Sequence, residues 1–326
     1  MENRITVRQL TKGELDEIAL FLERCPHLPY TCYPEVTPSS SARLVLSEIR
    51  GLLEAGGFCL AGMRGGGPVG LVTGQELGWD SEQLGVAAGR LTHLLVWDPE
   101  VSRRSLVREA VDECRRRGIL HLSCRVPSPD IPSVHALQAE RFRVVEALLT
   151  FGFRHGRDQV RMERSGALVA PCDGSEEEIR WVAGLAAVAF DQDRFHVDPR
   201  VPRERADELH RAWIENSCRG FADVVFVARD AAGGARLGFL SCKKQEAASN
   251  SLPLSFANIV LGAVAPEARG RGVYTDLNLE AMDWSQARVD VLEVGTQYTN
   301  VQAARLYMRT GFQYVRADVS LRLWME

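Results

Sequence analysis

The chain has 326 residues, of which 45% are hydrophobic and 25% charged, and its net charge at pH 7 is −4. This length is long for one hydrophobic core and suits two domains, and the composition is that of an ordinary globular protein. The acidic balance argues against a nucleic-acid partner, and the absence of a long apolar run argues against a membrane span.

The cysteines and the N-terminus predict a cytoplasmic protein. The first residues lack the apolar core of a signal peptide. The eight cysteines lie far apart with no C-x-x-C pair, as expected of reduced thiols in a cytosolic chain. Since the seven histidines do not cluster with the cysteines at ligand spacing, we expect no metal site.

The N-terminal half alternates strand and helix patterns around a proline-rich loop at 25–41. Strands are predicted at 5–10, 57–64, 67–77, 89–99, 120–126 and 142–154. Helices are predicted at Lys12–Glu23, Ala42–Ala55, Ser105–Arg117 and Ser133–Glu140. Three glycines, 65–67, form the turn between the second and third strands.

The C-terminal half begins after a small, polar stretch at 166–175, which is typical of a linker. Ser175 and Glu178 then form a capping-box signature at a helix start. Helices are predicted at Glu176–Phe190, Arg203–Cys218, from about 273 through Trp284, and at Val301–Arg309. Strands are predicted at 223–229, 235–245, 255–266, 289–297 and 312–324.

Both halves show the same order of elements, and a weak repeat relates them. At an offset of 170 residues, chemically related positions coincide: Asp130 with Asn300, Leu137 with Tyr307, and Phe142 with Phe312. We therefore predict two copies of one mixed α/β unit. The predicted domains are 1–165 and 176–326, joined by the linker 166–175.

The sequence Arg269-Gly270-Arg271-Gly272 stands between a predicted strand and a predicted helix. A helix start exposes backbone N–H groups that have no partner inside the helix, and the helix dipole favours an anion there. Glycines allow close approach, and arginines add charge-assisted hydrogen bonds. The pattern is neither a P-loop nor a Rossmann fingerprint. It predicts a pyrophosphate site, with a basic surface turn as the alternative.

This stretch and a second one resemble a known family. Val264-Ala265-Pro266 precedes the arginine–glycine sequence, and a later segment carries Asn300, Ala303, Tyr307, Gly311 and Phe312 in the spacing N-x-x-A-x-x-x-Y-x-x-x-G-F. Together they resemble motifs A and B of the GCN5-related N-acetyltransferases (GNAT). The resemblance implies a mixed α/β fold of two tandem GNAT-like domains. The N-terminal domain is expected to be degenerate, since it has no glycine in the matching turn and Leu137 in place of the tyrosine.

The resemblance implies acetyl-CoA as cosubstrate. Its pyrophosphate would lie on the backbone of residues 269–274, and its pantetheine would pair beside Ala263 and Val264 like an added strand. The residues expected to bind it are Ala263, Val264, Arg269, Gly270, Arg271, Gly272, Val273, Tyr274, Asn300 and Ala303. Tyr274 departs from the family, which has a small residue there. For Asn300, a plain helix cap is the alternative role.

Tyr307 takes the family's general-acid position. Amine attack on a thioester releases a thiolate, whose conjugate acid has a pKa of about 8.5, and a phenol with a pKa of about 10 can protonate it. The alternative is a buried aromatic side chain that packs against the sheet. No general base stands out. Asp191, Asp193, His196 and Glu293 are candidates, and a water relay would also serve.

A narrower resemblance indicates the acceptor. Residues 190–220 resemble the segment F-x-x-x-R-F…W-I-E-N-x-x-R-G of the dTDP-fucosamine N-acetyltransferases, which acetylate a nucleotide-linked 4-amino-4,6-dideoxyhexose. The acceptor residues implied are Arg194, Phe195, Trp213 and Asn216. Phe195 and Trp213 can stack on a base or sugar, and Arg194 can pair with a diphosphate. Core packing for Trp213 and a surface ion pair for Arg194 are the alternatives.

The sequence thus favours an acetyl-CoA-dependent N-acetyltransferase that acts on a small-molecule amine, most simply a sugar nucleotide, as a monomer or homodimer. Two other hypotheses stay open. One is transfer to another amine, such as an antibiotic, a polyamine or a peptide N-terminus. The other is a non-catalytic module that binds acyl-CoA.

Overall fold

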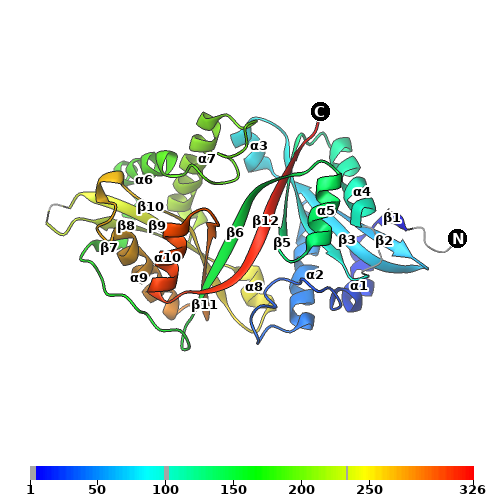
Figure 1. The fold of residues 1–326 in the computed structure, drawn as a ribbon, viewed down its shortest axis with the longest axis horizontal. Coiled ribbons are helices and arrows are strands. Elements are labelled where there is room, and N and C mark those ends of the chain that lie inside the picture. Colours follow the sequence, from blue (N-terminus) through cyan, green and yellow to red (C-terminus); the bar gives the residue numbers. More distant parts are fainter. Residues whose placement is uncertain (1–4, 99–102, 233) are drawn as a thin grey trace. The chain divides into compact units, whose positions relative to one another are not determined.

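The computed structural model describes residues 5–98, 103–232 and 234–326 (Figure 1). The strands are β1 Thr6–Gln9, β2 Phe58–Arg64, β3 Gly67–Glu76, β4 Ala88–Val96, β5 His121–Pro127, β6 Arg143–Arg154, β7 Leu168–Pro171, β8 Val224–Arg229, β9 Arg236–Lys244, β10 Phe256–Val264, β11 Val291–Gln297 and β12 Gln313–Trp324. The helices are α1 Leu15–Leu22, α2 Pro38–Glu54, α3 Gly78–Leu84, α4 Arg103–Arg116, α5 Ile131–Ala139, α6 Glu176–Ala189, α7 Arg203–Asn216, α8 Glu246–Ser251, α9 Val273–Gln286 and α10 Val301–Thr310. Within the described ranges, no helix has the length and apolarity needed to cross a membrane.

The chain forms two compact units. Unit 1 contains residues 1–147, 250–253 and 317–326, and unit 2 contains residues 148–249 and 254–316. The strand order is β1-β2-β3-β4-β5-β12 in unit 1 and β6-β11-β10-β9-β8-β7 in unit 2. In each sheet one neighbouring pair is parallel, β4 with β5 and β10 with β11. The chain therefore builds one mixed α/β sheet twice.

The two units exchange their last strands. In unit 1, β5 pairs antiparallel with β12 from the end of the chain, with His121 opposite Trp324. In unit 2, β11 pairs with β6 from the first half of the sequence, with Val291 opposite Arg154. The offset of 170 residues that relates the two repeats also relates β6 to β12. The two strands therefore occupy equivalent places in the two units, in the same register. Strand β6 of the first repeat lies in unit 2, however, and strand β12 of the second repeat lies in unit 1.

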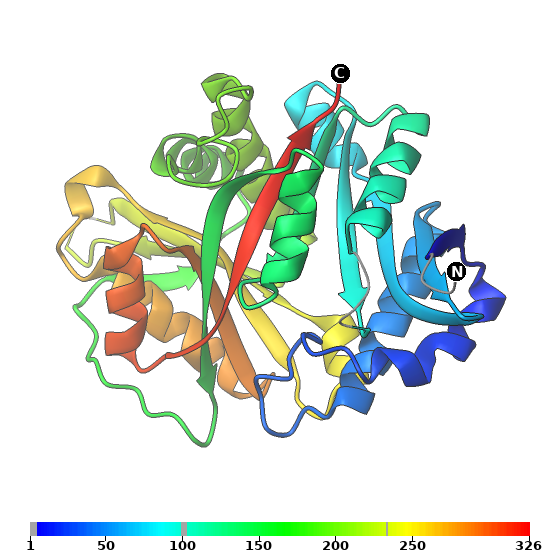
Figure 2. The same ribbon diagram turned by 45° about the vertical axis from the view of Figure 1, so that its right-hand side comes forward.

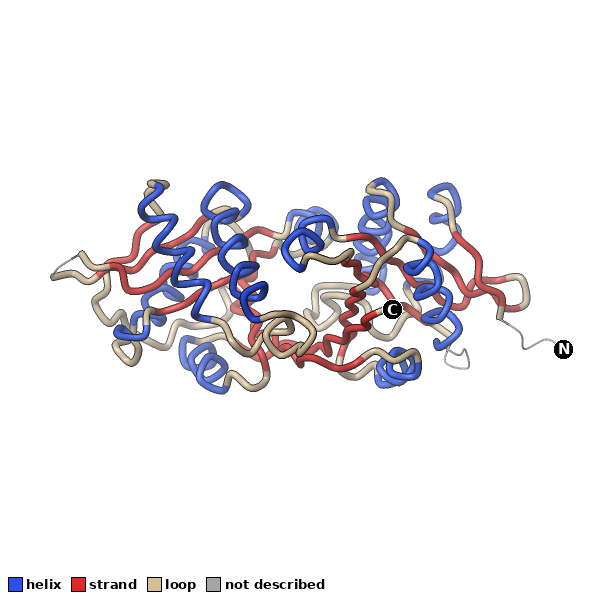
Figure 3. The backbone as a smooth tube through the Cα atoms, turned by 90° about the horizontal axis from the view of Figure 1, so that it is seen from above, coloured by secondary structure: helices blue, strands red, loops and turns tan. Residues whose placement is uncertain are grey.

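Alternation along the strands places apolar side chains on both faces of the unit 1 sheet. On β2, Phe58 and Leu60 pack with α4 and α5, whereas Cys59 and Ala61 pack with α1 and α2. Figure 2 shows helices on both sides of the strands of this unit. Unit 2 likewise has helices on both sides of its strands (Figure 3). Its core includes Phe151 and Phe153 of β6. Both sheets are therefore covered on both faces, as mixed α/β folds require.

The structure corrects several sequence predictions of local structure. Helices α3 and α8 are short and lacked a recognisable helical pattern. The stretch 166–175, expected to be a linker, contains strand β7, which pairs with β8 along the sheet edge. Small and polar residues are compatible with an edge strand, because such a strand has little apolar surface to bury. The domain boundaries remain a prediction, and unit 2 also includes residues 148–165.

Candidate active site

Strand β10 separates from β11 in its second half. The parallel pairing runs from Phe256 opposite Val291 only as far as Ile259 opposite Val294. On the other side, the pairing with β9 shifts register between Ile259 and Gly262, which marks a β-bulge. The Ser241 hydroxyl secures the bulge, since it accepts from the Leu261 N–H at 3.1 Å and donates to the Leu261 carbonyl at 3.3 Å. Among the described residues, no strand pairs with the β11-facing side of Ala263 and Val264.

A glycine-rich turn connects β10 to α9. Gly270 and Gly272 have φ angles of +76° and +77°, a region that residues with a Cβ enter at a cost. Within the described chain, no acceptor is present for the backbone N–H groups of Gly270, Gly272, Val273 and Tyr274. Four unpaired donors at the positive end of a 14-residue helix form a strong anion-binding arrangement.

The two arginines of this turn differ in their surroundings. Arg271 Nη2 donates to Asp230 Oδ2 at 2.7 Å. Arg269 is exposed and has no ion-pair partner among the described residues. The sequence predicts that both arginines bind the cofactor. In the structure, Arg269 is more accessible to an anionic ligand than Arg271, which Asp230 already binds.

Gly272 also allows a close contact with the segment that precedes β7. A Cβ built on Gly272 would lie 1.8 Å from Ser165 Oγ. Asp276, in the first turn of α9, accepts from the Ser165 N–H at 2.6 Å and from the Ala167 N–H at 2.8 Å. A larger residue at 272 would therefore disturb this contact directly, so that such a variant does not report on phosphate binding alone.

Tyr307 lies in α10 with its side chain 3% exposed, among Phe151, Phe312 and Tyr274. The hydroxyls of Tyr307 and Tyr274 are 3.0 Å apart and share a hydrogen bond. Tyr274 lies against the separating part of β10, since a Cβ on Gly262 would be 2.9 Å from the Tyr274 hydroxyl. Two phenols therefore meet beside the opening between β10 and β11.

Burial sets the acid–base state of both phenols. Desolvation raises the pKa of Tyr307 well above its ordinary value, and the neighbouring Tyr274 raises it further. Desolvation also raises the pKa of Tyr274, although its hydrogen bond to Tyr307 acts in the opposite direction. Both side chains are neutral at physiological pH, so Tyr307 retains the proton that a general acid must donate.

Asn300 is the N-cap of α10, and its side-chain Oδ1 accepts from the Ala303 N–H at 3.1 Å. The equivalent residue in unit 1, Asp130, caps α5 by accepting from the Ser133 N–H at 3.3 Å. The capping role is thus present in both repeats. Contact of Asn300 and Ala303 with a cofactor stays a prediction.

The predicted acceptor residues lie in the loop 190–202 and in α7. Phe195 is buried, and the Arg194 guanidinium lies 4.6 Å from the centre of its ring. Trp213 is half-buried and packs against the unit 2 core, which agrees with core packing, the alternative role given above for this residue. Asn216 is exposed at the end of α7. The structure places Arg194 and Phe195 in contact, and a role in substrate binding stays a prediction for all four.

The base candidates have different environments. Arg316 binds both Glu293 carboxylate oxygens, at 2.6 and 3.1 Å, so this carboxylate is already engaged in an ion pair. Asp191 is exposed. Asp193 and His196 form a pair that His210 joins, and sequence reasoning did not single out His210.

The N-terminal repeat has a different set of residues. Leu137, at the position equivalent to Tyr307, is fully buried in the unit 1 core. The stretch Ser102–Leu106, which matches the arginine–glycine turn, has no glycine; Ser102 lies outside the described residues, and the rest begins α4. Strand β4 nevertheless pairs with β5 only from Ala88 to Leu91, so unit 1 keeps the strand separation without the phenol.

The bulged and separated strand, the unpaired amides at the start of α9 and the buried phenol all lie in unit 2, and together they form a candidate site for acyl transfer. Comparison with known proteins finds that residues 157–312 match the acetyltransferase (GNAT) family. The chain is similar to the GNAT family in this segment, and the similarity supports an N-acetyltransferase.

Curated relatives are similar at low identity. The dTDP-fucosamine acetyltransferase of Escherichia coli is 27% identical over 191 residues, which is 58% of this chain and 75% of the relative. The spore coat polysaccharide biosynthesis protein SpsD of Bacillus subtilis is 26% identical over 205 residues, 61% of this chain and 65% of the relative.

Solved structures share the fold over the whole chain. A GCN5-related N-acetyltransferase from Sphaerobacter thermophilus superimposes with a TM-score of 0.64 at 16% identity and covers 99% of this chain and 96% of its own. A tandem GNAT protein from the clavulanic acid biosynthesis pathway gives 0.55 at 14% identity, covering 98% of both chains. The prediction of two tandem GNAT-like domains is thereby confirmed.

Proposed function

We propose that the protein transfers an acetyl group from acetyl-CoA to the amine of a nucleotide-linked 4-amino-4,6-dideoxyhexose. The observation that carries the transfer is the arrangement in unit 2: unpaired amides at the start of α9, separated strands β10 and β11, and the phenol of Tyr307. The first suits a pyrophosphate, the second an extended pantetheine, and the third a departing thiolate.

In the proposed complex, the pyrophosphate accepts hydrogen bonds from the amides of Gly270, Gly272, Val273 and Tyr274. The pantetheine pairs with β10 at Ala263 and Val264, where no strand of the described chain does so. Its thioester then lies toward Tyr307. The amine attacks the acetyl carbon, the C–S bond breaks, and the thiolate takes the phenol proton. The nitrogen loses its extra proton to water, and the phenol regains a proton from solvent before the next turnover.

Arg269→Ala is expected to weaken CoA binding by about 10–150-fold, the equivalent of a charge-assisted hydrogen bond of about 1.5–3 kcal/mol. Arg271→Ala is the matched control, and we expect a smaller loss because Asp230 already binds that side chain. Calorimetric titration measures both affinities and the stoichiometry, expected to be one CoA per chain. Two sites per chain, or the reverse order of effects, would contradict this assignment.

The proposed acceptor rests on the segment 190–220 and on the names of the relatives. One relative is named for dTDP-fucosamine, and the other for a coat polysaccharide. In this chain the loop 190–202 supplies an aromatic ring, Phe195, beneath a guanidinium, Arg194. An arginine held over an aromatic ring presents its remaining N–H groups in a fixed plane, which suits a diphosphate.

Arg194→Ala is expected to raise the KM for the sugar nucleotide at least about tenfold, since a charge-assisted contact is lost, and to leave the KM for acetyl-CoA nearly unchanged. Arg180→Ala, an exposed arginine of α6 in the same unit, is the matched control. Steady-state kinetics with each substrate varied gives both constants. An equal rise in both KM values would mean that the loop, rather than the acceptor site, is damaged.

The reaction itself is tested with radiolabelled acetyl-CoA and a panel of nucleotide amino sugars, aminoglycosides, spermidine and peptides. Transfer to a nucleotide amino sugar supports the proposal. Transfer only to another amine removes the acceptor assignment and keeps the acetyl transfer. Binding of CoA without transfer to any amine favours a non-catalytic module. No disulfide joins the eight cysteines, which supports a reducing compartment such as the cytoplasm.

A further inference from the structure

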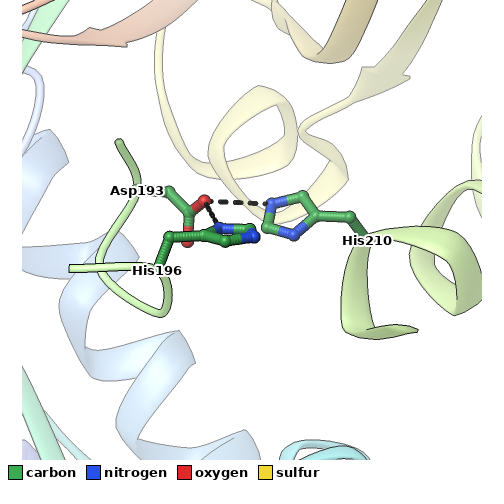
Figure 4. Close-up of side chains that lie close together, drawn as sticks. All are labelled: Asp193, His196 and His210. Carbon is green, nitrogen blue, oxygen red and sulfur yellow. Dashed lines mark hydrogen bonds and ion pairs between the residues drawn. The ribbon is translucent and has the colours of Figure 1, made fainter. Parts of the chain in front are cut away.

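Three side chains from two segments of unit 2 converge on one point (Figure 4). Asp193 and His196 lie in the loop 190–202, and His210 lies on α7. Asp193 Oδ2 is in contact with His196 Nδ1 and is 3.6 Å from His210 Nε2. One ligand atom from each of the three residues lies within 4.8 Å of the others. These histidines have no cysteine at ligand spacing, so the cluster has no familiar metal-binding pattern in the sequence.

The other polar atom of each side chain is held by a separate partner. Asp193 Oδ1 accepts from the Phe195 N–H at 2.9 Å. His196 Nε2 is 2.9 Å from Asp207 Oδ1, and His210 Nδ1 is 2.9 Å from the Ala206 carbonyl oxygen. This is the arrangement of ligands to a metal, in which a carboxylate or carbonyl orients each imidazole from behind.

These outer partners determine which nitrogens carry hydrogen. A carbonyl oxygen only accepts, so His210 Nδ1 is the donor, and Nε2 of the neutral ring presents a lone pair. His196 lies between two carboxylates, with Asp207 Oδ1 at Nε2 and Asp193 Oδ2 at Nδ1. In the tautomer that donates to Asp207, Nδ1 presents a lone pair. Two imidazole lone pairs and a carboxylate oxygen then face one another in a buried place, and a shared cation satisfies all three.

We propose that Asp193, His196 and His210 bind one divalent transition-metal ion, and zinc is the ion used to test the site. Two imidazoles and a carboxylate are ordinary zinc ligands, at about 2.0–2.2 Å from the ion. Tetrahedral ligands at that distance are about 3.4 Å apart, close to the separation of Asp193 Oδ2 and His210 Nε2. The contact between Asp193 and His196 lengthens when the ion enters, and a fourth position stays open.

The ion would join the loop 190–202 to α7. It would fix the backbone on either side of Arg194 and Phe195, which follow Asp193 directly. This inference rests on the geometry of the three ligands and holds whichever amine the enzyme acetylates.

A second group of potential ligands shows why this cluster is distinctive. Cys172, Asp173 and Glu178 also lie together. There, Arg229 and Arg236 both bind Glu178 Oε1, and Glu178 Oε2 accepts from the Asp173 N–H at 2.7 Å. The carboxylate is thus already neutralised by two cations. Among the described residues, no arginine or lysine forms a salt bridge with Asp193.

The test is the zinc content of the full-length protein. Wild type is dialysed against Zn²⁺ and then against metal-free buffer, and bound metal is measured by elemental analysis and by titration calorimetry. We expect about one zinc per chain. His196→Gln and His210→Gln should each weaken binding by at least about tenfold. His155→Gln, a half-buried histidine of the same unit, is the matched control and should retain the ion.

Two further measurements keep the result decisive if a variant folds poorly. A chelator should lower the Tm of wild type and of His155→Gln, and leave the Tm of the ligand variants unchanged. Co²⁺ added to metal-free wild type should give the visible absorption of a four-coordinate ion. Wild type without bound zinc and without that absorption would overturn the proposal, and would leave the hydrogen bonds between His196 and two aspartates as the explanation of the cluster. Equal zinc binding by all variants would overturn it too.

Discussion

Tyr307→Phe should lower kcat by about 10²–10⁴-fold, the usual contribution of a general acid, while the affinity for acetyl-CoA stays the same. Phenylalanine fills the same space among Phe151, Phe312 and Tyr274 and lacks only the hydroxyl. The thiolate would then leave without a proton donor. Rapid mixing with acetyl-CoA and acceptor, analysed as single turnovers, isolates the chemical step.

Tyr274→Phe is the matched control. It removes the partner of the Tyr307 hydroxyl at 3.0 Å but leaves Tyr307 its proton, so we expect a smaller loss than in Tyr307→Phe. An unchanged single-turnover rate in Tyr307→Phe would mean that the thiolate leaves without this phenol. Equal losses in both variants would instead indicate that the two hydroxyls act as a pair.

The pH dependence follows from the raised pKa of Tyr307. The protonated phenol is the active form, so activity from this group is lost only as pH rises through its pKa. Burial holds that pKa well above the ordinary value of about 10. The single-turnover rate of the wild type should therefore show no fall due to Tyr307 between pH 7 and about 10.

A fragment of residues 166–326, the C-terminal part cut at the start of the expected linker, should fail to fold. It lacks β6, which pairs with β11 from Val291 to Gln297. It also loses Phe151 and Phe153, which are 2% and 4% exposed. Removing a buried phenylalanine ring costs about 3–5 kcal/mol, so two rings cost about as much as the whole stability of a typical domain, about 5–15 kcal/mol.

A fragment of residues 148–316 is the comparison, because it keeps the part of β6 that pairs with β11, from Leu148 to Arg154, and ends before β12 enters unit 1. We expect it to unfold cooperatively in urea with a native-like near-ultraviolet circular dichroism spectrum, and the shorter-cut fragment to show neither. If residues 166–326 unfold cooperatively, or if both fragments behave alike, then β6 is not needed by unit 2.

The repeat explains why the sequence predicted the elements but not their pairing. Strands β6 and β12 have matching hydrophobic patterns and the same offset as the rest of the repeat. The pattern therefore does not distinguish whether each strand pairs with β5 or with β11. Apolar alternation specifies that a strand is buried and on which face, and it does not specify which copy of the sheet receives it. The exchange became visible only when register was known.

Some features of the candidate site could be predicted from the sequence, and others could not. The arginine–glycine turn and the capping Asn300 are local features, since each depends on residues within one turn of a helix, and both could be predicted. The contact between Tyr274 and Tyr307 joins residues 33 positions apart, and it could not. Tyr274 appeared only as a departure from the family pattern, whereas its phenol reaches the proposed general acid.

The metal-like cluster was hidden for a related reason. Asp193 and His196 are three residues apart, but His210 comes from the second turn of the next helix. No familiar spacing covers a loop and a helix face together. The signal that could have revealed it was the presence of two of the seven histidines, with three aspartates, within residues 193–210.

The exchanged strands also bear on how the protein is made. Arg125 of β5 donates a hydrogen bond to Ser320 of β12 across 195 residues of sequence. At about 5–20 residues per second, a ribosome needs about 10–40 s to synthesise that distance. During this interval the nascent first unit presents the edge of β5 without its partner, and an unpaired edge invites other strands. Folding of the first unit is thus completed only after a strand about 195 residues further along the chain has been translated.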